Sequence, residues 1–390
     1  MSGKSRIRPL ERDDIPQVAG LYELVMRSGS RTPSPGLADY FERTILDYPW
    51  ADPQIPSLVY EEADGEITGF HGSHVRRFLL GSEPIRIGCG GQVVAHPRVR
   101  HKAVGALLMR RYLMGPQDLT ITDTASVPTH AMWGKLHGEE VSLSCINWTR
   151  LFRPWRFTGD RLLPDRGARV ARPLWSMLDP VTTRLPGVGS RTRESGLNAE
   201  ELTSHALVEN VEKLASSLAL RPDYDVPFLD WLFEELSQVR SYGALVRTLL
   251  RDDDGAVVGW YVYFVVPGGT SHVLQIMASD PQVGDVLDHL FADAQSRRSA
   301  ALRGRLEPRL LEPLARRRSI LRWEGGALVS SRHQSLLNAV AYGHSLLTRM
   351  DSEWWMGHHL EPLDSSTASG AQPAGPNTDS ARRAGGLPPT

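Results

Sequence analysis

The sequence predicts a mixed α/β protein of two successive domains, each with a mixed, mostly antiparallel sheet flanked by helices. The length of 390 residues exceeds that of a usual single domain. Segments with helical periodicity alternate with short strand-like runs along the chain. Both halves contain a hairpin signal, Asp64-Gly65 in the first and Asp254-Gly255 in the second. The expected division is a first domain at 1–155, a linker at 156–198, a second domain at 199–357 and a disordered tail at 358–390.

The elements of the first half follow from local signals. Apolar residues at 7–9 predict a short strand, and Asp14 before Ile15-Pro16 opens a helix that runs to Arg27. Strand-like runs flank Asp64-Gly65, and a later strand ends at His96-Pro97. The further expected elements are a helix at 37–46, strands at 56–61, 67–72, 86–95 and 119–123, and helices at 104–113 and 129–136.

The second half repeats this alternation after a break. Residues 156–198 are rich in Pro, Gly and Arg, which is typical of a connector. From Asp364 onward the chain has almost no large apolar residues and cannot offset the entropy of ordering. The expected elements are helices at 199–218, 227–236 and 283–294, and strands at 244–250, 257–264 and 273–278.

Composition excludes several classes of protein. The net charge is −1, from 44 basic and 45 acidic residues, which disfavours binding to nucleic acid or to an anionic membrane surface. Cys89 and Cys145 are the only cysteines, too few for a disulfide scaffold or a multi-cysteine zinc site. The charged N-terminus lacks an apolar signal core, and no apolar run is long enough to span a bilayer. We expect a soluble, cytoplasmic protein with no metal and no nucleic-acid or membrane partner.

One strand-to-helix turn carries a candidate binding site. After the strand that contains Val93, Val94 and Ala95, a basic stretch leads into a helix that opens with small residues. Amide groups at a helix N-terminus favour an anion such as a pyrophosphate, and small side chains let the backbone approach it. An ordinary basic turn is the alternative interpretation. The residues of the turn are Arg98, Arg100, His101, Lys102, Ala103, Val104, Gly105 and Ala106.

This turn resembles motif A of the GNAT N-acetyltransferase superfamily, which reads Gln/Arg-x-x-Gly-x-Gly/Ala after a strand. The matching run is Arg100 to Gly105, with Ala103 in place of the first glycine. The likeness extends over residues 1 to about 150: 7–25 resembles the opening strand and helix, the Asp64-Gly65 hairpin resembles the next two strands, and 126–138 resembles motif B.

The resemblance implies acetyl-CoA, or another acyl-CoA, as co-substrate, with direct transfer of the acyl group to an amine. The pyrophosphate would bind the amides of Arg100, His101, Lys102, Ala103, Val104, Gly105 and Ala106, and the pantetheine would pair with Val93, Val94 and Ala95. A small-molecule amine or amino sugar is the expected acceptor, and a homodimer is possible.

Several residues are candidate catalytic groups. The family's motif B tyrosine corresponds to Trp133, and the glycine that follows corresponds to His137, so a tyrosine acid is not transferred. Asp123, at a strand end, and His130, on the next helix, are the candidate acid and base. Four further candidates are Cys89, Gln92, His71 and His74; Cys89 would allow a covalent route, but a thiol in an apolar strand favours an inert buried one.

The second half lacks the basic turn. Asp280 and Asp285 stand where the phosphate turn would be, and they would repel a pyrophosphate. We expect a degenerate, tandem copy, and the resemblance implies that it shapes the acceptor pocket or the domain interface. Its candidate polar groups are the charged run 303–309 and the segment 351–355, which mixes carboxylates with tryptophans, either as a polar-amine site or as core aromatics.

Two other functions remain open. A non-catalytic acyl-CoA or ligand-binding module would explain the missing motif B tyrosine. An aminoacyl transferase similar to the Fem-type enzymes would use charged tRNA, which the near-neutral charge disfavours.

Overall fold

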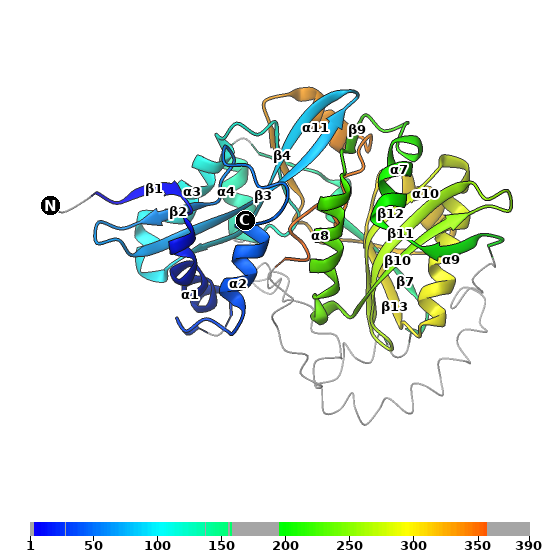
Figure 1. Cartoon of the computed structure of the whole chain (residues 1–390), viewed down its shortest axis with the longest axis horizontal. Coiled ribbons are helices and arrows are strands. Elements are labelled where there is room, and N and C mark those ends of the chain that lie inside the picture. The colour runs from blue at the N-terminus through cyan, green and yellow to red at the C-terminus, as the bar shows by residue number, and fades with distance from the viewer. Residues whose placement is uncertain (1–3, 28, 137, 155–156, 158–194, 357–390) are drawn as a thin grey trace, which may run out of the picture.

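Two β-sheets, each with helices on its faces, stand side by side in a computed structural model of the chain (Figure 1). The structure describes residues 4–27, 29–136, 138–154, 157 and 195–356. Most of the predicted linker, the predicted tail and His137 lie outside these residues. The predicted fold class, mixed sheets flanked by helices, is confirmed.

Among the residues that the structure describes, the first sheet has eight strands, and β4 and β5 are its only parallel neighbours. The long β3–β4 hairpin extends past the predicted strand end at residue 72, and its tip pairs with β9 of the second half. In order the strands are β1 (Arg6–Pro9), β2 (Leu58–Glu61), β3 (Ile67–Leu80), β4 (Glu83–Ala95), β5 (Leu119–Thr122), β15 (Leu328–Ser331) and β6 (Glu139–Glu140), with β9 (Leu220–Pro222) beside β3.

The second sheet repeats this order. In the part of the chain that the structure describes, it has seven strands and one parallel pair, β12 with β13. In order the strands are β8 (Asn198–Glu201), β10 (Ala244–Arg251), β11 (Val257–Val265), β12 (Thr270–Ala278), β13 (Ala301–Arg305), β7 (Ile146–Leu151) and β14 (Ile320–Trp323). The sixth strand of each sheet comes from the other half of the chain: β15 enters the first sheet and β7 the second. The predicted domain boundaries stay predictions. Each sheet also contains a strand from the other side of the predicted linker.

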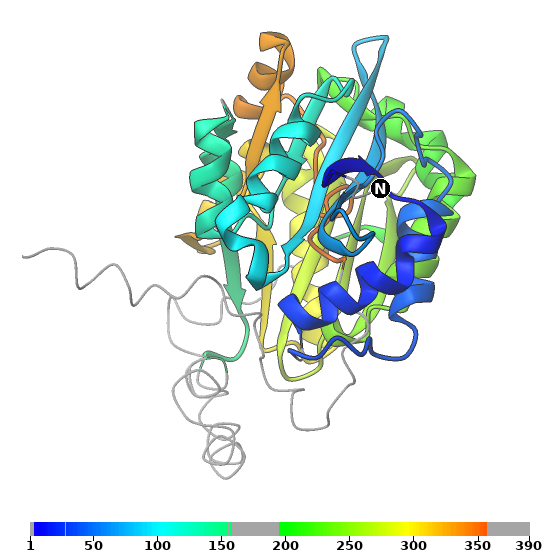
Figure 2. The same cartoon turned by 90° about the vertical axis from the view of Figure 1, so that its left-hand side faces the viewer.

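Helices cover the faces of both sheets. Figure 2 looks onto the first sheet and shows α1 (blue) and α3 (cyan) in front of its strands. One prediction is wrong: residues 198–201 pair with β10 as β8, and the helix expected from residue 199 begins only at Ser204, where Thr203 caps it. The helices are α1 (Ile15–Met26), α2 (Leu37–Phe41) with a π-helical extension (Glu42–Leu46), α3 (Val104–Leu113), α4 (Val127–Lys135), α7 (Ser204–Leu214), α8 (Val226–Ser237), α9 (Val283–Ser296), α10 (Leu311–Arg316) and α11 (Gln334–Ala341).

The two halves share a hydrophobic core. Trp50 of the first half stacks on Phe228 of α8 with ring centroids 3.5 Å apart, and its indole Nε1 donates to Asp225 Oδ2 at 2.8 Å. Trp355 belongs to the same buried cluster. Because burial of large aromatic rings contributes several kcal/mol to stability, this shared cluster fixes the halves against each other.

Residues 344–356 run between the halves and position the site described below. Arg76 of β3 is fully buried, and its Nε donates to the backbone oxygen of Asp351 at 2.9 Å. The Asp351 carboxylate accepts from Thr348 Oγ1 at 2.7 Å and from the Tyr224 hydroxyl. These bonds connect β3, the segment 344–356 and the region before α8, and they place Ser352 and Glu353 against the first sheet.

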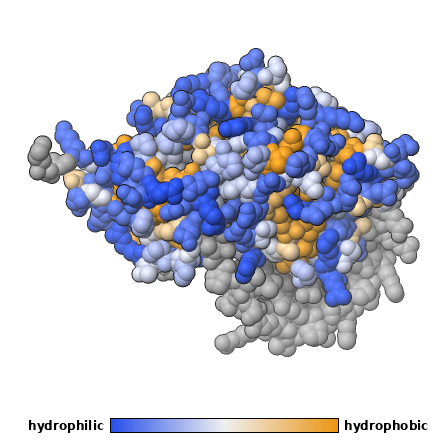
Figure 3. Space-filling view, viewed as in Figure 1, coloured by the Kyte–Doolittle hydropathy of each residue, from blue (hydrophilic) through white to orange (hydrophobic). Residues whose placement is uncertain are grey.

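The surface seen in Figure 3 is mainly hydrophilic with scattered apolar areas, as is usual for a folded domain. Among the larger exposed apolar side chains, Ile320, Leu321 and Trp323 all lie on the edge strand β14. Within the ranges that the structure describes, no helix is long and apolar enough to cross a membrane.

Gly69→Val is expected to destabilise the fold because α3 packs directly on β3 at this position. A Cβ atom on Gly69 would lie 2.4 Å from Val104 Cγ1 and 2.9 Å from Leu108 Cδ1. Overpacking of this kind lowers the free energy of unfolding by about 1–3 kcal/mol. Urea denaturation measures the loss. Gly196→Val, where a Cβ meets nothing within 4 Å, is the control, and equal stability of the two variants would contradict the tight packing.

Candidate functional site

The turn between β4 and α3 contains a residue in the left-handed conformation. A 3₁₀ segment, Pro97–Lys102, follows β4, and Ala103 then adopts the left-handed conformation with φ 51° and ψ 37°. This conformation favours glycine and costs an alanine about 1–2 kcal/mol. Ala103 therefore holds a backbone conformation that glycine adopts more easily.

The N-terminus of α3 is open to a ligand. Among the described residues, no backbone acceptor is recorded for the N–H groups of Val104 and Gly105, whereas Ala106 donates to the Ala103 oxygen at 2.9 Å. A Cβ atom on Gly105 would meet nothing within 4 Å. Two free amide donors beside empty space, at the positive end of a helix dipole, can bind an anion.

The basic side chains of the turn divide into two groups. Lys102 Nζ contacts both carboxylate oxygens of Glu62 at 2.9 Å, and Arg98 pairs with Glu66. Arg100 and His101 are exposed, and no ion pair is recorded for either within the described ranges. The side-chain groups available to an anion at this turn are therefore the Arg100 guanidinium and the His101 imidazole.

The edge of β4 next to the turn is also available. β4 pairs with β5 only from Ile87 to Cys89, so Val93, Val94 and Ala95 lie beyond the last paired residue. The register of β4 against β3 shifts next to Gln92, which has a φ of 55°. A bulge of this kind turns backbone groups away from the regular ladder. The strand ends here as an open edge that leads to the N-terminus of α3.

The corresponding place in the second half is filled. Gly284 is the second residue of α9, as Gly105 is of α3. Arg317 Nη2 donates to the Gly284 oxygen at 2.7 Å, and a Cβ on Gly284 would lie 2.9 Å from that nitrogen. Arg317 also pairs with Asp288 at 2.7 Å. The Arg317 side chain, paired with Asp288, thus occupies the space beside Gly284. The equivalent space beside Gly105 is open.

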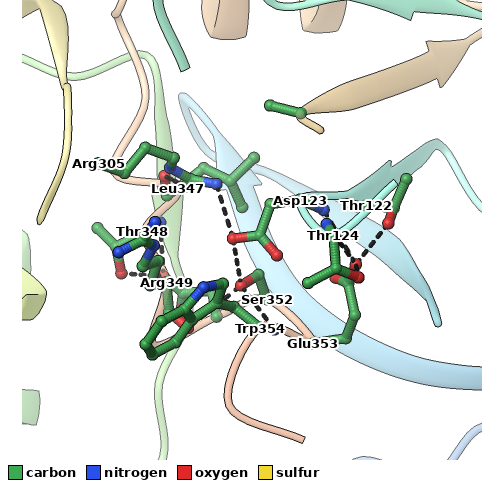
Figure 4. Close-up of polar contacts among 12 residues, drawn as sticks. Thr122, Asp123, Thr124, Arg305, Leu347, Thr348, Arg349, Ser352, Glu353 and Trp354 are labelled. Atoms are coloured by element: carbon green, nitrogen blue, oxygen red, sulfur yellow. Dashed lines mark hydrogen bonds and ion pairs between the residues drawn. The ribbon is translucent and has the colours of Figure 1, made fainter. Parts of the chain in front are cut away.

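Asp123 lies at the end of β5, where the two halves meet (Figure 4). Its Oδ2 accepts from Ser352 Oγ at 2.7 Å and from Arg305 Nη1 at 3.1 Å, while its buried Oδ1 has no hydrogen-bond partner among the described residues. Burial, together with the nearby Glu353 charge, raises the pKa of the Asp123 carboxyl to about 7, and Arg305 opposes the rise. A carboxyl with this pKa and a free oxygen is suited to accept a proton near neutral pH.

Glu353 anchors the segment 344–356 on the first sheet and holds the loop that carries Asp123. One oxygen accepts from the backbone N–H of Asp123 at 3.0 Å, from Thr124 Oγ1 at 2.8 Å and from the Thr122 hydroxyl. The other accepts from Cys89 Sγ at 3.0 Å. Hydrogen bonds to a buried charge are worth about 1.5–3 kcal/mol each, so Glu353 fixes the position of Asp123.

Arg305 and a small cavity complete the surroundings of Asp123. Arg305 is the last residue of β13, which takes the place in the second sheet that β5 takes in the first, and its Nη2 donates to the Leu347 oxygen at 2.6 Å. Asp123 and Arg305 line a cavity of about 30 Å³, together with Ser144, Glu307 and other residues. This volume holds one or two water molecules, which could exchange a proton with Asp123.

Cys89 and the two histidines of β3 are not suited to act on a ligand. Burial, together with the negative charge of Glu353, raises the pKa of the Cys89 thiol, so it stays protonated and is a poor nucleophile. Burial lowers the pKa of His71 to about 4 and that of His74 to about 3. His71 packs against the Tyr112 ring with centroids 4.3 Å apart. The three residues are neutral parts of the core.

The structure does not bring His130 to Asp123. His130 is exposed on α4, and its Nε2 lies 2.5 Å from Glu140 Oε2. Trp133, on the same helix, is buried, and its Nε1 donates to the Val329 oxygen at 3.1 Å. The indole at the motif B position therefore has a packing role.

The sequence did not connect Asp123 with Ser352, Glu353 and Arg305. Only two sequence features pointed to these residues. They are the segment 351–355, which mixes carboxylates with tryptophans, and the charged run 303–309. Asp123 and Arg305 are 182 residues apart, and Asp123 and Glu353 are 230 apart, so no local pattern joins them.

Comparisons with solved structures identify the fold. Each of three matches has a probability of 1.00. A protein of unknown function from Enterococcus faecalis V583, described as a probable N-acyltransferase, has a TM-score of 0.55 at 11% identity, covering 86% of this chain and 75% of its own. A GCN5-related N-acetyltransferase from Anabaena variabilis ATCC 29413 has a TM-score of 0.54 at 10% identity, with the same coverage. A GCN5-related N-acetyltransferase from Kribbella flavida has a TM-score of 0.51 at 11% identity, covering 84% of this chain and 71% of its own.

The chain therefore has the fold of GCN5-related N-acetyltransferases, as its resemblance implied. At these identities the likeness shows the fold alone. No protein-family model and no curated protein sequence matches the chain. Activity has to be argued from the residues of the site.

Proposed function

We propose that the protein is an acyl-CoA-dependent N-acyltransferase, in the simplest case an acetyltransferase, that acts on a small-molecule amine or amino sugar. The observation that carries the proposal is the open N-terminus of α3, where Val104 and Gly105 offer free amides next to the open edge of β4. The fold supports it, because its solved examples include proteins described as N-acetyltransferases.

The residues at the turn fit the chemistry of coenzyme A. The amides of Val104 and Gly105, with Arg100 and His101 beside them, would hold the pyrophosphate. Val93 to Ala95 would pair with the amide groups of the pantetheine, because this stretch of β4 has no partner in β5. The filled turn at α9 supports a single acyl-CoA site in the first half.

Direct attack by the acceptor nitrogen on the thioester carbonyl is the step that the site favours. The new C–N bond forms and the C–S bond breaks. The nitrogen becomes cationic on attack and releases a second proton to solvent, while coenzyme A leaves as the thiolate and takes up a proton from solvent. Asp123, with its free Oδ1, accepts the proton that the ammonium of the acceptor must lose. Backbone N–H groups beside the β4 bulge would stabilise the negative charge on the carbonyl oxygen. The protonated Cys89 disfavours a covalent acyl-cysteine route.

A non-catalytic acyl-CoA-binding module is the second candidate, since Trp133 replaces the tyrosine that related enzymes use as an acid. Free thiol release from acetyl-CoA over a panel of amines separates the two functions. Release that depends on the amine supports the enzyme. Acetyl-CoA binding without release for any amine would support the module and contradict the enzyme.

The pH dependence of turnover is a sharper prediction. Because the base form of Asp123 is required and its pKa is about 7, kcat/KM should rise as the pH increases through about 7. Glu353→Gln removes a negative charge that raises this pKa, so the rise should move to lower pH. Thiol release from pH 5 to 9 measures both profiles. A wild-type profile that is flat across this range would exclude Asp123 as the base.

A further inference from the structure

We infer that the acceptor carries an anionic oxygen group, a carboxylate or a phosphate, in addition to its amine, and that Arg349 binds this group. The inference rests on the proposed function, because it describes the acceptor of the same site. It comes from a buried guanidinium that the protein itself does not neutralise by contact.

Arg349 is buried at 7% exposure, and its hydrogen-bonding groups are only partly used. Nη2 donates to Asn147 Oδ1 at 2.7 Å, but Nε and Nη1 are buried without a hydrogen-bond partner in the part of the chain that the structure describes. No carboxylate lies within ion-pair distance of Arg349 in the same part. The Asp123 carboxylate attracts the Arg349 guanidinium electrostatically but makes no recorded ion pair with it. A buried cation without a contacting anion costs several kcal/mol, and a ligand anion in contact with it would reduce this cost.

Ser352 places this cation next to the proposed base. Its hydroxyl oxygen lies 2.7 Å from Asp123 Oδ2 and 3.2 Å from the backbone oxygen of Arg349. Asp123 Oδ1 is also buried without a partner in the described ranges. Ser352 therefore links the turn that carries a cationic group with unused donors to the carboxylate that carries an unused acceptor oxygen. A molecule with an ammonium and an anionic group would satisfy both, the ammonium at Asp123 and the anion at Arg349.

Trp354 covers the Arg349 guanidinium, and two further rings pack on Trp354, which favours a compact acceptor. Trp354 lies over Arg349, with Cζ 4.4 Å from the ring centroid, and it stacks on Tyr242 at 4.5 Å. His272 lies 5.5 Å from the Trp354 ring, and burial lowers its pKa far below the usual value, so it adds no charge. Trp354 is only partly buried. In this low-dielectric setting the contact between Arg349 and an anion is stronger than at an exposed site.

Matched pairs of amines test the inference. The pairs are glycine with glycinamide, β-alanine with propylamine, and O-phosphoethanolamine with ethanolamine, each assayed by thiol release from acetyl-CoA on the full chain. At least one anionic member should have a kcat/KM at least tenfold above its neutral partner. The amino acids and the phosphate ester report separately on carboxylate and phosphate.

Variants then assign the preference to Arg349. Arg349→Gln should reduce the ratio of kcat/KM between anionic and neutral members toward one, and Arg349→Lys should keep a preference. If Arg349→Gln does not fold, inhibition of the wild type decides: propionate should compete with the acceptor and propionamide should not.

The outcomes separate this inference from the proposed function. If the neutral amine of each pair reacts as well as the anionic one, the role of Arg349 is overturned. The proposed acyltransferase activity is unaffected by this result. An anionic preference that persists in Arg349→Gln would also overturn that role. Absence of thiol release with every amine, together with absence of acetyl-CoA binding, would refute the proposed function and the inference that depends on it.

Discussion

Asp123→Asn should lower kcat/KM for acyl transfer by about 10²–10³-fold, because an amide cannot accept the proton of the attacking amine. The substitution preserves the size of the side chain and its contacts with Ser352 and Arg305. Binding of acetyl-CoA should change little, because Asp123 lies at the end of β5 and not at the turn before α3. Steady-state kinetics with the best amine of the panel, at pH 8, measure the effect. Retention of more than a tenth of the wild-type activity would exclude Asp123 as the base.

A measurement of stability tests whether unfolding causes the loss of activity in Asp123→Asn. The folded-state pKa of about 7 lies above the ordinary value of 3.8. Folding therefore favours protonated Asp123, and the free energy of unfolding falls as the pH rises from about 4 to 7. The full loss, at most about 4 kcal/mol, is present above pH 7. Asp123→Asn lacks this loss, so its stability relative to wild type should be higher at pH 8 than at pH 5. Asp254→Asn, in an exposed turn, is the control for both measurements.

Gly105→Glu should weaken acetyl-CoA binding by at least about 100-fold, equivalent to about 2.7 kcal/mol. The new carboxylate would stand at the N-terminus of α3, where the pyrophosphate binds, and would add like-charge repulsion to steric exclusion. The fold should remain intact, because a Cβ atom at Gly105 meets nothing within 4 Å and glutamate is a better helix former than glycine. Calorimetric titration with acetyl-CoA measures the affinity.

Gly134→Glu is the matched control for this variant. Gly134 also lies in a helix and is exposed, and a Cβ atom added there would meet nothing within 4 Å. It should bind acetyl-CoA as the wild type does. If Gly105→Glu kept wild-type affinity, the binding site would lie elsewhere on the protein.

The turn before α3 shows what local sequence can predict. The predicted helix at 104–113 has the observed bounds, and Pro97 ends the regular strand as expected. These features depend on residues that are neighbours in sequence: a proline, a basic stretch and small side chains. The two hairpins were predictable for the same reason, since Asp-Gly determines a tight turn without help from distant residues.

The surroundings of Asp123 could not be predicted in this way. Glu353 reaches Asp123 only because residues 344–356 pass between the two sheets, and Arg305 reaches it because β13 and β5 end near each other. The exchange of β7 and β15 is equally non-local, since a short apolar strand does not encode which sheet it joins. The helix predicted from residue 199 failed for this reason: pairing with β10 outweighed the helical pattern at its start.

The melting temperature in the presence of acetyl-CoA tests the central claim most directly, because every step of the account requires an acyl-CoA site at α3. A ligand at 100 times its Kd stabilises a protein by about 2.7 kcal/mol. We predict a rise of several degrees for the wild type and for Gly134→Glu at millimolar acetyl-CoA, and no rise for Gly105→Glu. No rise for the wild type, or an equal rise in all three proteins, would contradict the account.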